Sequence, residues 1–335
     1  MALTLTQLEY LATDEMKKGI MKTIIKESPI LQRLPFVTVT GNSYLYNVES
    51  TEAGTQWATV GAIITESPPI YAQRTAALSN LIGDADVDQF MAQSRTNVQD
   101  ITAAIIELKA KAIAYEFEKQ FIYGGVTTTS PTYVFDGLLK LIAESDSTDL
   151  TTCTDLNPDD NTQVISQVLT ASSAGATLSL IKIDETVDAV RPGKPDCLIM
   201  SRMARRDVNS LMHASGVGLA VSKDEFGRMN TMWGDTPILV NDFIKDNMQD
   251  PTAGIALPLA TVYATNWSAG YDNYLIFACK FGESEFHGLQ NRGIQVEPIG
   301  TLETKDAKRT RIKWYVGAAM PGLKSCAVLI NANAD

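Results

Sequence analysis

The side chains that most often perform catalysis are scarce in this chain. Its 335 residues include two histidines, His213 and His287, although histidine is the commonest general base and metal ligand near neutral pH. Neither histidine lies in an H-x-x-x-H spacing or near a nucleophile elbow. We therefore predict no catalytic residue, no cofactor and no bound metal. An acidic enzyme that works through carboxylates is the alternative that this composition leaves open.

Two short motifs resemble ligand-binding loops without completing them. Residues 84–88 carry three alternate aspartates, as at the start of a calcium-binding EF-hand loop, but Gln89 stands where that loop needs glycine and Arg95 where it needs glutamate. Residues 288–293, GLQNRG, have the glycine spacing of a phosphate loop, but Ile294 follows in place of lysine. We therefore expect neither motif to bind a ligand.

Two groups of basic residues are candidates for a charged surface. Arg202, Arg205 and Arg206 would share one face of a helix, where they could bind an anion, lie in water, or pair with acidic side chains across an interface. Residues 309–313 alternate basic with other side chains, which on a strand gives one buried face and one basic face exposed to water or a partner. This strand lacks the interleaved aromatic residues that stack on nucleic-acid bases.

The overall charge is acidic, with 28 basic and 39 acidic side chains and a net charge of −11. Such a surface disfavours tight, non-specific phosphate binding. Four widely spaced cysteines, at positions 153, 197, 279 and 326, predict free thiols in a reducing compartment. No apolar run reaches the roughly 18 residues of a membrane span, and the N-terminus lacks a signal-peptide pattern. We expect synthesis in the cytoplasm, no membrane contact, and one large or two medium domains.

The element that would position the rest is a long helix at residues 96–123. Apolar residues recur there at steps of three and four, and a second apolar stripe runs beside the first. Gly124 and Gly125 follow at once and favour the left-handed end of a helix. At 1.5 Å per residue the helix would be roughly 40 Å long. We predict a spine that spans the molecule.

Two segments before the spine lack an obvious partner within their own sequence. Residues 4–26 have an imperfect helical stripe and would form an arm that packs on something else. Residues 36–82 predict two long strands, joined by a Gly-, Ser- and Pro-rich interval that carries a tryptophan and two isoleucines. An isolated hairpin is marginally stable in water, so this one is expected to lie on another protein.

After the spine, helices and strands alternate. A helix at 135–143 and a polar excursion at 144–162 precede an α/β region at 178–281, in which Ser201 caps a helix and residues 215–230 form a glycine-rich, mobile loop. The closing strands are expected at 293–299, 309–320 and 326–330.

Four stretches carry a resemblance that covers essentially the whole chain. They are IGDADVDQF before the spine, EKQFIYG at its end, FDGL after it, and the closing RIKWYVGAAMPGLKSCAVL. With the order of elements, they resemble the Hong Kong 97-type major capsid proteins of tailed bacteriophages. The resemblance implies an α+β fold with an N-terminal arm, an extended β-hairpin loop, a peripheral domain that holds the spine, and an α/β axial domain. The implied ranges are 1–35 for the arm, 36–93 for the extended loop, 94–174 with 292–335 for the peripheral domain, and 175–291 for the axial domain.

By this resemblance the chain is a structural protein of the virion and not an enzyme. It would assemble with itself, as hexamers and pentamers, into an icosahedral head that encloses double-stranded DNA without specific binding. Assembly would take place in the host cytoplasm. Axial domains would meet through the loop at 215–230, and each extended loop would lie over the neighbouring subunit. The candidate contacts between subunits are Leu5, Leu8, Trp57, Ile63, Ile64, Arg205 and Arg206.

The resemblance also bears on partners and alternatives. Because the sequence starts at Met1 with the arm in place, a separate scaffolding protein is expected, with a portal and, as an open option, decoration proteins. The interval 54–69 has no lysine, so the lysine–asparagine cross-link of the type member is not expected and the shell should be non-covalent. The alternatives are an encapsulin-like nanocompartment shell of the same fold and the acidic cytosolic α/β enzyme.

Overall fold

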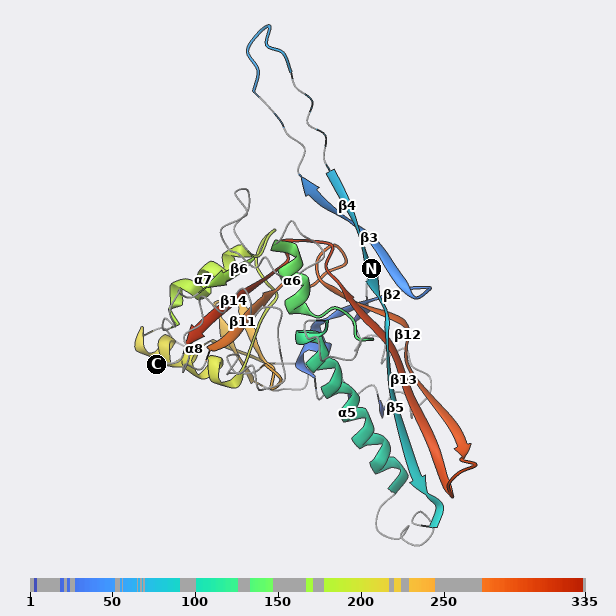
Figure 1. Cartoon of the computed structure of the whole chain (residues 1–335). Helices are drawn as coiled ribbons and strands as arrows, with labels where there is room; N and C mark the ends of the chain where they lie inside the picture. The colour runs from blue at the N-terminus through green and yellow to red at the C-terminus, as the bar shows by residue number, and fades with distance from the viewer. Residues whose placement is uncertain are drawn as a thin grey trace.

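The chain folds into two β-sheets that share one core, a long helix, and a hairpin that stands away from both (Figure 1). This computed structural model describes residues 3–4, 19–20, 23–24, 28–51, 55, 57–64, 66, 68, 70–90, 101–125, 133–146, 167–170, 178–216, 220–223, 229–244 and 273–333. Helices and strands are mixed without a regular alternation, so the α+β class is as predicted.

The smaller of the two main sheets has five strands in the order β1-β2-β12-β13-β5. These strands are Leu3–Thr4 (β1), Pro35–Thr38 (β2), His287–Thr301 (β12), Ala307–Ala319 (β13) and Ser79–Asp88 (β5). The β13–β5 ladder is antiparallel and runs without a register shift from Val316 opposite Ser79 to Ala307 opposite Asp88. Side chains on one face of β5 therefore lie directly opposite those on the same face of β13.

The predicted spine is helix α5, Ile101–Tyr123, which runs beside the five-stranded sheet (Figure 1). Its 23 residues give a length of about 34 Å, and positions 96–100 of the prediction lie outside the described residues. Phe117 is buried, with its ring centroid 4.9 Å from that of Trp314 on β13. Aromatic rings at this spacing add to the stabilisation from burial. The spine is thus fixed to the sheet through its apolar face.

The helix ends at the two predicted glycines. Gly125 has a φ of +71°, and a Cβ on Gly124 would lie 2.3 Å from the carbonyl oxygen of Phe135. The next helix, α6 (Leu138–Asp146), begins three residues after the predicted start. The Asp136 carboxylate, two residues before this helix, accepts a hydrogen bond of 2.6 Å from Lys140. The close approach at Gly124 brings the end of α5 against the start of α6.

The larger sheet has seven strands in the order β6-β14-β11-β7-β10-β9-β8. The strands are Val168–Thr170 (β6), Cys326–Asn333 (β14), Asn273–Cys279 (β11), Cys197–Met200 (β7), Thr236–Val240 (β10), Met229–Trp233 (β9) and Ala220–Lys223 (β8). Helices α7 (Leu180–Ala189) and α8 (Arg202–Ala214) bury their apolar residues on one face of this sheet. The opposite face of this sheet packs in the main core, to which α5 and α6 also contribute.

The glycine-rich loop predicted at 215–230 is corrected by the structure. Residues 220–223 and 229–233 form β8 and β9, which pair in antiparallel fashion at the edge of the seven-stranded sheet. Strand β9 also pairs with β10, the next strand of the sheet, so backbone hydrogen bonds hold β8 and β9 on the sheet. The local sequence shows the glycines of this segment, but it does not show that β10 lies beside it in the fold.

The predicted hairpin is present, with different strand ends. Strands β3 (Ser43–Thr51) and β4 (Ile70–Ala77) form a separate two-stranded sheet. The second predicted strand, 70–82, divides at Leu78, where the chain leaves the hairpin and enters β5. Tyr46 and Val48 are buried against residues of β12 and β13. The base of the hairpin therefore packs on its own subunit, while the rest extends away (Figure 1).

The described part of the N-terminal arm is helical at residues 19–20 and 23–24, as predicted, but it packs on its own subunit. Ile20 and Ile24 are buried in the main core of their own subunit, not against an outside partner. Residues of helix α3 (Pro29–Arg33), Ile30 and Leu31, are buried beside them, as is Leu34, which follows the helix. Leu3 and Thr4 form a strand against β2, where a helix was expected. Tertiary partners distant in sequence supply this burial. Leu5 and Leu8 lie outside the described residues.

In the part of the chain that the structure describes, no helix has the length and apolarity to cross a membrane.

Candidate assembly surfaces

Four large apolar side chains are strongly exposed at the tip of the hairpin. Trp57 is 105% exposed, Ile63 91% and Ile64 73%, and Val60 beside them is 108% exposed. Burying one large apolar side chain stabilises a complex by roughly 1.5–3 kcal/mol. A contiguous apolar group that the subunit does not cover is typical of an interaction surface. Three of the predicted contact residues thus lie together at the far end of the hairpin.

The strands below the tip have two distinct faces. Tyr46 and Val48 of β3 are buried against the body, whereas Leu45, on the opposite face, is 58% exposed. Tyr71 of β4 is exposed as well, at 65%. Side chains alternate between the faces of a strand, so Leu45 and Tyr71 are two apolar residues on an outer face that otherwise carries mainly polar side chains. Sequence reasoning did not identify Leu45 or Tyr71, although the alternation of β3 contains the signal.

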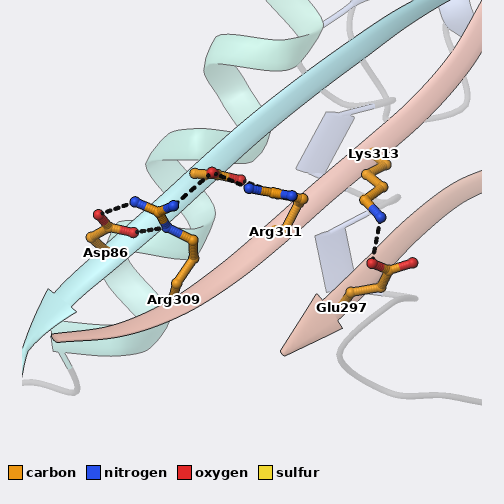
Figure 2. A network of polar contacts seen from close by, with 6 residues as sticks. Asp86, Glu297, Arg309, Arg311 and Lys313 are labelled. Carbon is orange, nitrogen blue, oxygen red and sulfur yellow. Dashed lines mark hydrogen bonds and ion pairs between the residues drawn. The ribbon is translucent and has the colours of Figure 1, made fainter. Parts of the chain in front are cut away.

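A network of charged side chains joins β5 to β13 (Figure 2). Arg311 Nε and Nη2 donate hydrogen bonds of 2.6 and 2.8 Å to the two oxygens of Asp84. Arg309 makes the same two-point contact with Asp86, at 2.6 and 2.8 Å. A further contact of 3.4 Å joins Arg309 to Asp84. In each of the two-point pairs, the arginine and the aspartate lie directly opposite each other in the β5–β13 ladder.

The network continues to the next strand. Lys313 of β13 donates a hydrogen bond of 2.5 Å to Glu297 of β12 (Figure 2). The face therefore carries a basic strand between the two aspartates of β5 and one glutamate of β12. The predicted basic face of 309–313 is corrected: its charge is neutralised within the same chain. Two of the three alternate aspartates, Asp84 and Asp86, are therefore the partners of two of the alternate basic residues, Arg311 and Arg309.

These contacts shift the ionisation of the groups involved. Hydrogen bonds from Arg311 lower the pKa of Asp84, and those from Arg309 lower the pKa of Asp86. The same bonds raise the pKa of both arginines. Two-point guanidinium–carboxylate pairs are the strong form of this interaction. The network holds the strands together, and its three basic side chains are matched by three carboxylates.

Helix α8 carries the other two predicted contact residues. Ser201 caps the helix as predicted, its Oγ accepting a hydrogen bond of 3.1 Å from the Ala204 amide. Arg205 and Arg206 are exposed on the helix surface. Arg202, on the same face, is held by Asp242 through contacts of 2.5 and 2.6 Å. Helix α8, which carries both residues, packs on the seven-stranded sheet, away from the hairpin (Figure 1).

The histidines and cysteines belong to structural positions. His287 is fully buried, with its ring edge against Tyr44, and burial lowers its pKa. His213 lies near the exposed end of α8. Three cysteines, Cys197, Cys279 and Cys326, are free, buried and paired in register across β7, β11 and β14. Burial raises the pKa of the Cys197 and Cys279 thiols, so they remain unreactive thiols.

Neither incomplete ligand motif forms a loop. Residues 288–293 belong to β12, with an irregularity in its pairing to β13 after Asn291, where Arg292 has a φ of +58°. Among the described residues, no group of three or more histidine, cysteine or acidic side chains could hold a metal ion.

A model of the phage capsid family matches residues 9–271 of the chain. The chain belongs to the phage capsid family. The Hong Kong 97-type fold predicted from the sequence is confirmed, and so is the function of a major capsid protein, with the capsid of the virion as its location. Membership of this family makes it a structural protein.

Solved structures share the fold at low sequence identity. The holo-SrpI encapsulin complex from Synechococcus elongatus PCC 7942 is 16% identical with a TM-score of 0.60, over 99% of this chain and 97% of that chain. The capsid of a native GTA particle is 16% identical with a TM-score of 0.59, over 91% and 90%. The structure from Mycobacterium phage Bobi is 16% identical with a TM-score of 0.56, over 90% of each chain. No curated protein matches the chain.

Proposed function

We propose that this capsid protein assembles with copies of itself, as hexamers and pentamers, into an icosahedral head around double-stranded DNA. The observation that carries the proposal is the hairpin tip, where Trp57, Ile63 and Ile64 extend from the body almost fully exposed. A subunit that leaves such a surface uncovered needs neighbours to bury it. The tip would lie over the adjacent subunit, and Leu5 and Leu8 would contribute contacts from the arm.

The proposed domains are an arm at 1–35, an extended loop at 36–93, a peripheral domain at 94–174 and 292–335, and an axial domain at 175–291. The seven-stranded sheet joins the last two, because β6 and β14 come from the peripheral ranges and β7 to β11 from the axial range. A shared sheet makes these domains move together as one body. The axial domains would meet around the capsomer axis through the edge that carries β8 and β9.

The proposed head encloses DNA without gripping it. The net charge is −11, and Arg309, Arg311 and Lys313 of the most basic strand, β13, pair with Asp86, Asp84 and Glu297. Tight binding to duplex DNA needs several lysine or arginine contacts to phosphates and falls steeply with salt. Isolated capsomers should therefore bind DNA weakly; strong binding that decreases steeply with added salt would contradict this part of the proposal.

The further partners of the proposed head are a separate scaffolding protein, a portal and, as an option, decoration proteins. Assembly would take place in the host cytoplasm. Co-expression of the chain with candidate scaffolding and portal proteins, followed by purification of the particles, identifies which of them enter the shell.

Electron microscopy of the purified chain tests the main proposal. We expect closed shells or rings of five and six subunits, with sedimentation far above that of a single chain. Uniform small particles without rings would contradict assembly and favour the acidic α/β enzyme instead.

An encapsulin-like nanocompartment is the second candidate, because the SrpI encapsulin structure matches 99% of this chain. The two candidates differ in contents and in gene neighbours. Shells that contain DNA, with terminase and portal genes nearby, support the phage head. Shells that contain a co-purified cargo enzyme, with a peroxidase or ferritin-like gene nearby, would favour the compartment.

A further inference from the structure

Two neighbouring helices on the seven-stranded sheet expose faces of opposite charge. Helices α7 and α8 pack on the same face of this sheet and contribute to one apolar cluster. Ile183 of α7 and Ala204 and Val208 of α8 are among the residues they bury there. The side of each helix that faces away from the sheet is therefore free to meet another molecule.

The outer face of α8 is basic. Arg202, Arg205 and Arg206 occupy positions i, i+3 and i+4, which lie together on a helix surface, and all three are exposed. Asp242 holds Arg202 by two hydrogen bonds. Within the described residues, no hydrogen bond or ion pair is found for the guanidinium groups of Arg205 and Arg206. In a chain with a net charge of −11, this uncompensated basic face is an exception.

The outer face of α7 is acidic. Asp184, Glu185 and Asp188 follow Ile181 at i+3, i+4 and i+7, and Ile181 itself is 69% exposed. Asp184 accepts a hydrogen bond of 3.0 Å from the Trp233 indole, which fixes its position. Lys182 contacts Glu185 at 2.6 Å. Three carboxylates against one ammonium leave the face negative.

The two faces match in length as well as in sign. The acidic groups span residues 184–188 and the basic groups 202–206, and four residue steps correspond to about 6 Å along a helix. Both faces lie on the same layer of one subunit, so they cannot turn toward each other without unpacking their buried residues. They can meet between two copies.

We propose that the basic face of α8 in one subunit binds the acidic face of α7 in the next copy around a capsomer. This inference rests on the proposed self-assembly and names the contact that directs it. The contact joins two different surfaces, so each subunit offers one of each, and the chain of contacts closes as a ring when the rotation between neighbours returns to the first subunit. Guanidinium–carboxylate pairs give such a contact its direction and register. A second copy fits better than nucleic acid, because the acidic face beside Arg205 and Arg206 repels phosphate.

Charge reversal tests the pairing. The first variant combines Arg205→Glu with Arg206→Glu, and the second combines Glu185→Lys with Asp188→Lys. At a concentration where the unmodified chain assembles, each double variant should reduce the fraction in rings or shells at least about tenfold, measured by sedimentation and electron microscopy. The quadruple variant, which exchanges the two charges, should recover assembly to within about twofold of the unmodified chain.

A mixture sharpens the test. In an equal mixture of the two double variants, each acidic α8 can meet a basic α7, and alternation is possible only in rings with an even number of subunits. Six-membered rings should reappear and five-membered rings should not. The matched control is Lys305→Glu with Lys308→Glu, at two exposed residues in and beside the β12–β13 turn. It changes the net charge by the same amount as the arginine double variant and should leave assembly unchanged.

The outcomes separate the contact from the function. If the unmodified chain assembles and both double variants assemble equally well, the α7–α8 contact is wrong and the capsid proposal stands. If all variants fold, by an unchanged melting temperature, and the quadruple variant does not recover, the pairing is also wrong. If the unmodified chain forms neither rings nor shells, both proposals are overturned. Should a double variant melt early, Arg205→Gln with Arg206→Gln replaces it, with the same expected loss.

Discussion

At the scale of single residues, exposure distinguishes two tryptophans with opposite roles. Trp314 of β13 is fully buried between α5 and the five-stranded sheet, whereas Trp57 at the hairpin tip is fully exposed. The first stabilises the subunit through its own packing, and the second is available to a neighbour. The same residue type therefore serves folding at one position and assembly at the other.

Substitution of each tryptophan by alanine separates these roles. Trp57→Ala should change the free energy of unfolding of the unassembled subunit by less than about 0.5 kcal/mol. It should raise the protein concentration needed for assembly at least tenfold, which corresponds to about 1.4 kcal/mol per contact. Trp314→Ala, the matched control, should cost the subunit about 3–5 kcal/mol. Urea unfolding and light scattering measure the two effects. An unchanged assembly threshold in Trp57→Ala would remove the tip from the interface.

The effect of replacing a glycine also depends on the atoms around it. A Cβ on Gly124 would lie 2.3 Å from a backbone oxygen, whereas a Cβ on Gly19, at a helical position, meets no atom within 4 Å. We expect Gly124→Ala to lower the free energy of unfolding by about 2–4 kcal/mol, because backbone at the end of α5 must shift. Gly19→Ala should raise it by up to about 1 kcal/mol. Denaturant unfolding of both variants is the measurement, and equal effects would show that the close approach at Gly124 is wrong.

At the scale of elements, the charge network fixes how β5 runs along β13. Asp84 and Asp86 each pair with the arginine directly opposite, and β5 follows the extended hairpin without a long connection. The direction in which the hairpin leaves the body therefore depends on this ladder as well as on the buried Tyr46 and Val48.

The lowered pKa values of Asp84 and Asp86 give this contribution a pH dependence. A carboxyl group whose pKa is lower in the folded chain stabilises the fold above its unfolded pKa, near 3.8, and this stabilisation is lost as the pH falls through the folded value. The double variant Asp84→Asn with Asp86→Asn should melt below the unmodified chain at pH 7. The difference should shrink as the pH falls below about 3.8.

The control for this titration removes the same charge elsewhere. Glu303→Gln with Asp306→Asn changes two exposed residues of the turn between β12 and β13, and it should alter the melting temperature little at either pH. A difference between the double variant and the unmodified chain that stays constant from pH 7 to pH 3 would contradict a role for the two ionised carboxylates.

At the scale of the whole molecule, the shape is unsuited to a solitary globule. The main core holds α5, α6 and both large sheets, yet the hairpin carries its apolar tip well away from that core (Figure 1). The described part of the arm packs on its own subunit. The need for neighbours therefore rests on the hairpin and on exposed helix faces.

We predict that the shell is held together by non-covalent contacts. Interval 54–69 contains no lysine, so an amide cross-link cannot start from a lysine at the tip. Particles that sediment as intact shells should give a single band near 36.4 kDa after denaturation in detergent. Bands at multiples of this mass would contradict the prediction.

The sequence by itself determined the kinds of elements and their order. Strong local patterns predicted the spine helix with its two closing glycines, the Ser201 cap, the hairpin with its apolar tip, and the closing strands. These features depend on neighbours within a few residues, so their signal is local. Together with the order of elements, they were enough to identify the capsid fold.

Only the tertiary structure decided which distant surfaces meet. Asp86 and Arg309 are 223 positions apart in sequence, and periodicity alone could not show that the acidic strand lies against the basic one. The burial of Ile20 and Ile24, and the order of residues 220–223 at a sheet edge, likewise come from partners far along the chain. Whether a charge is neutralised or an apolar side chain is buried depends on the segment that packs against it, and the tertiary fold determines which segment that is.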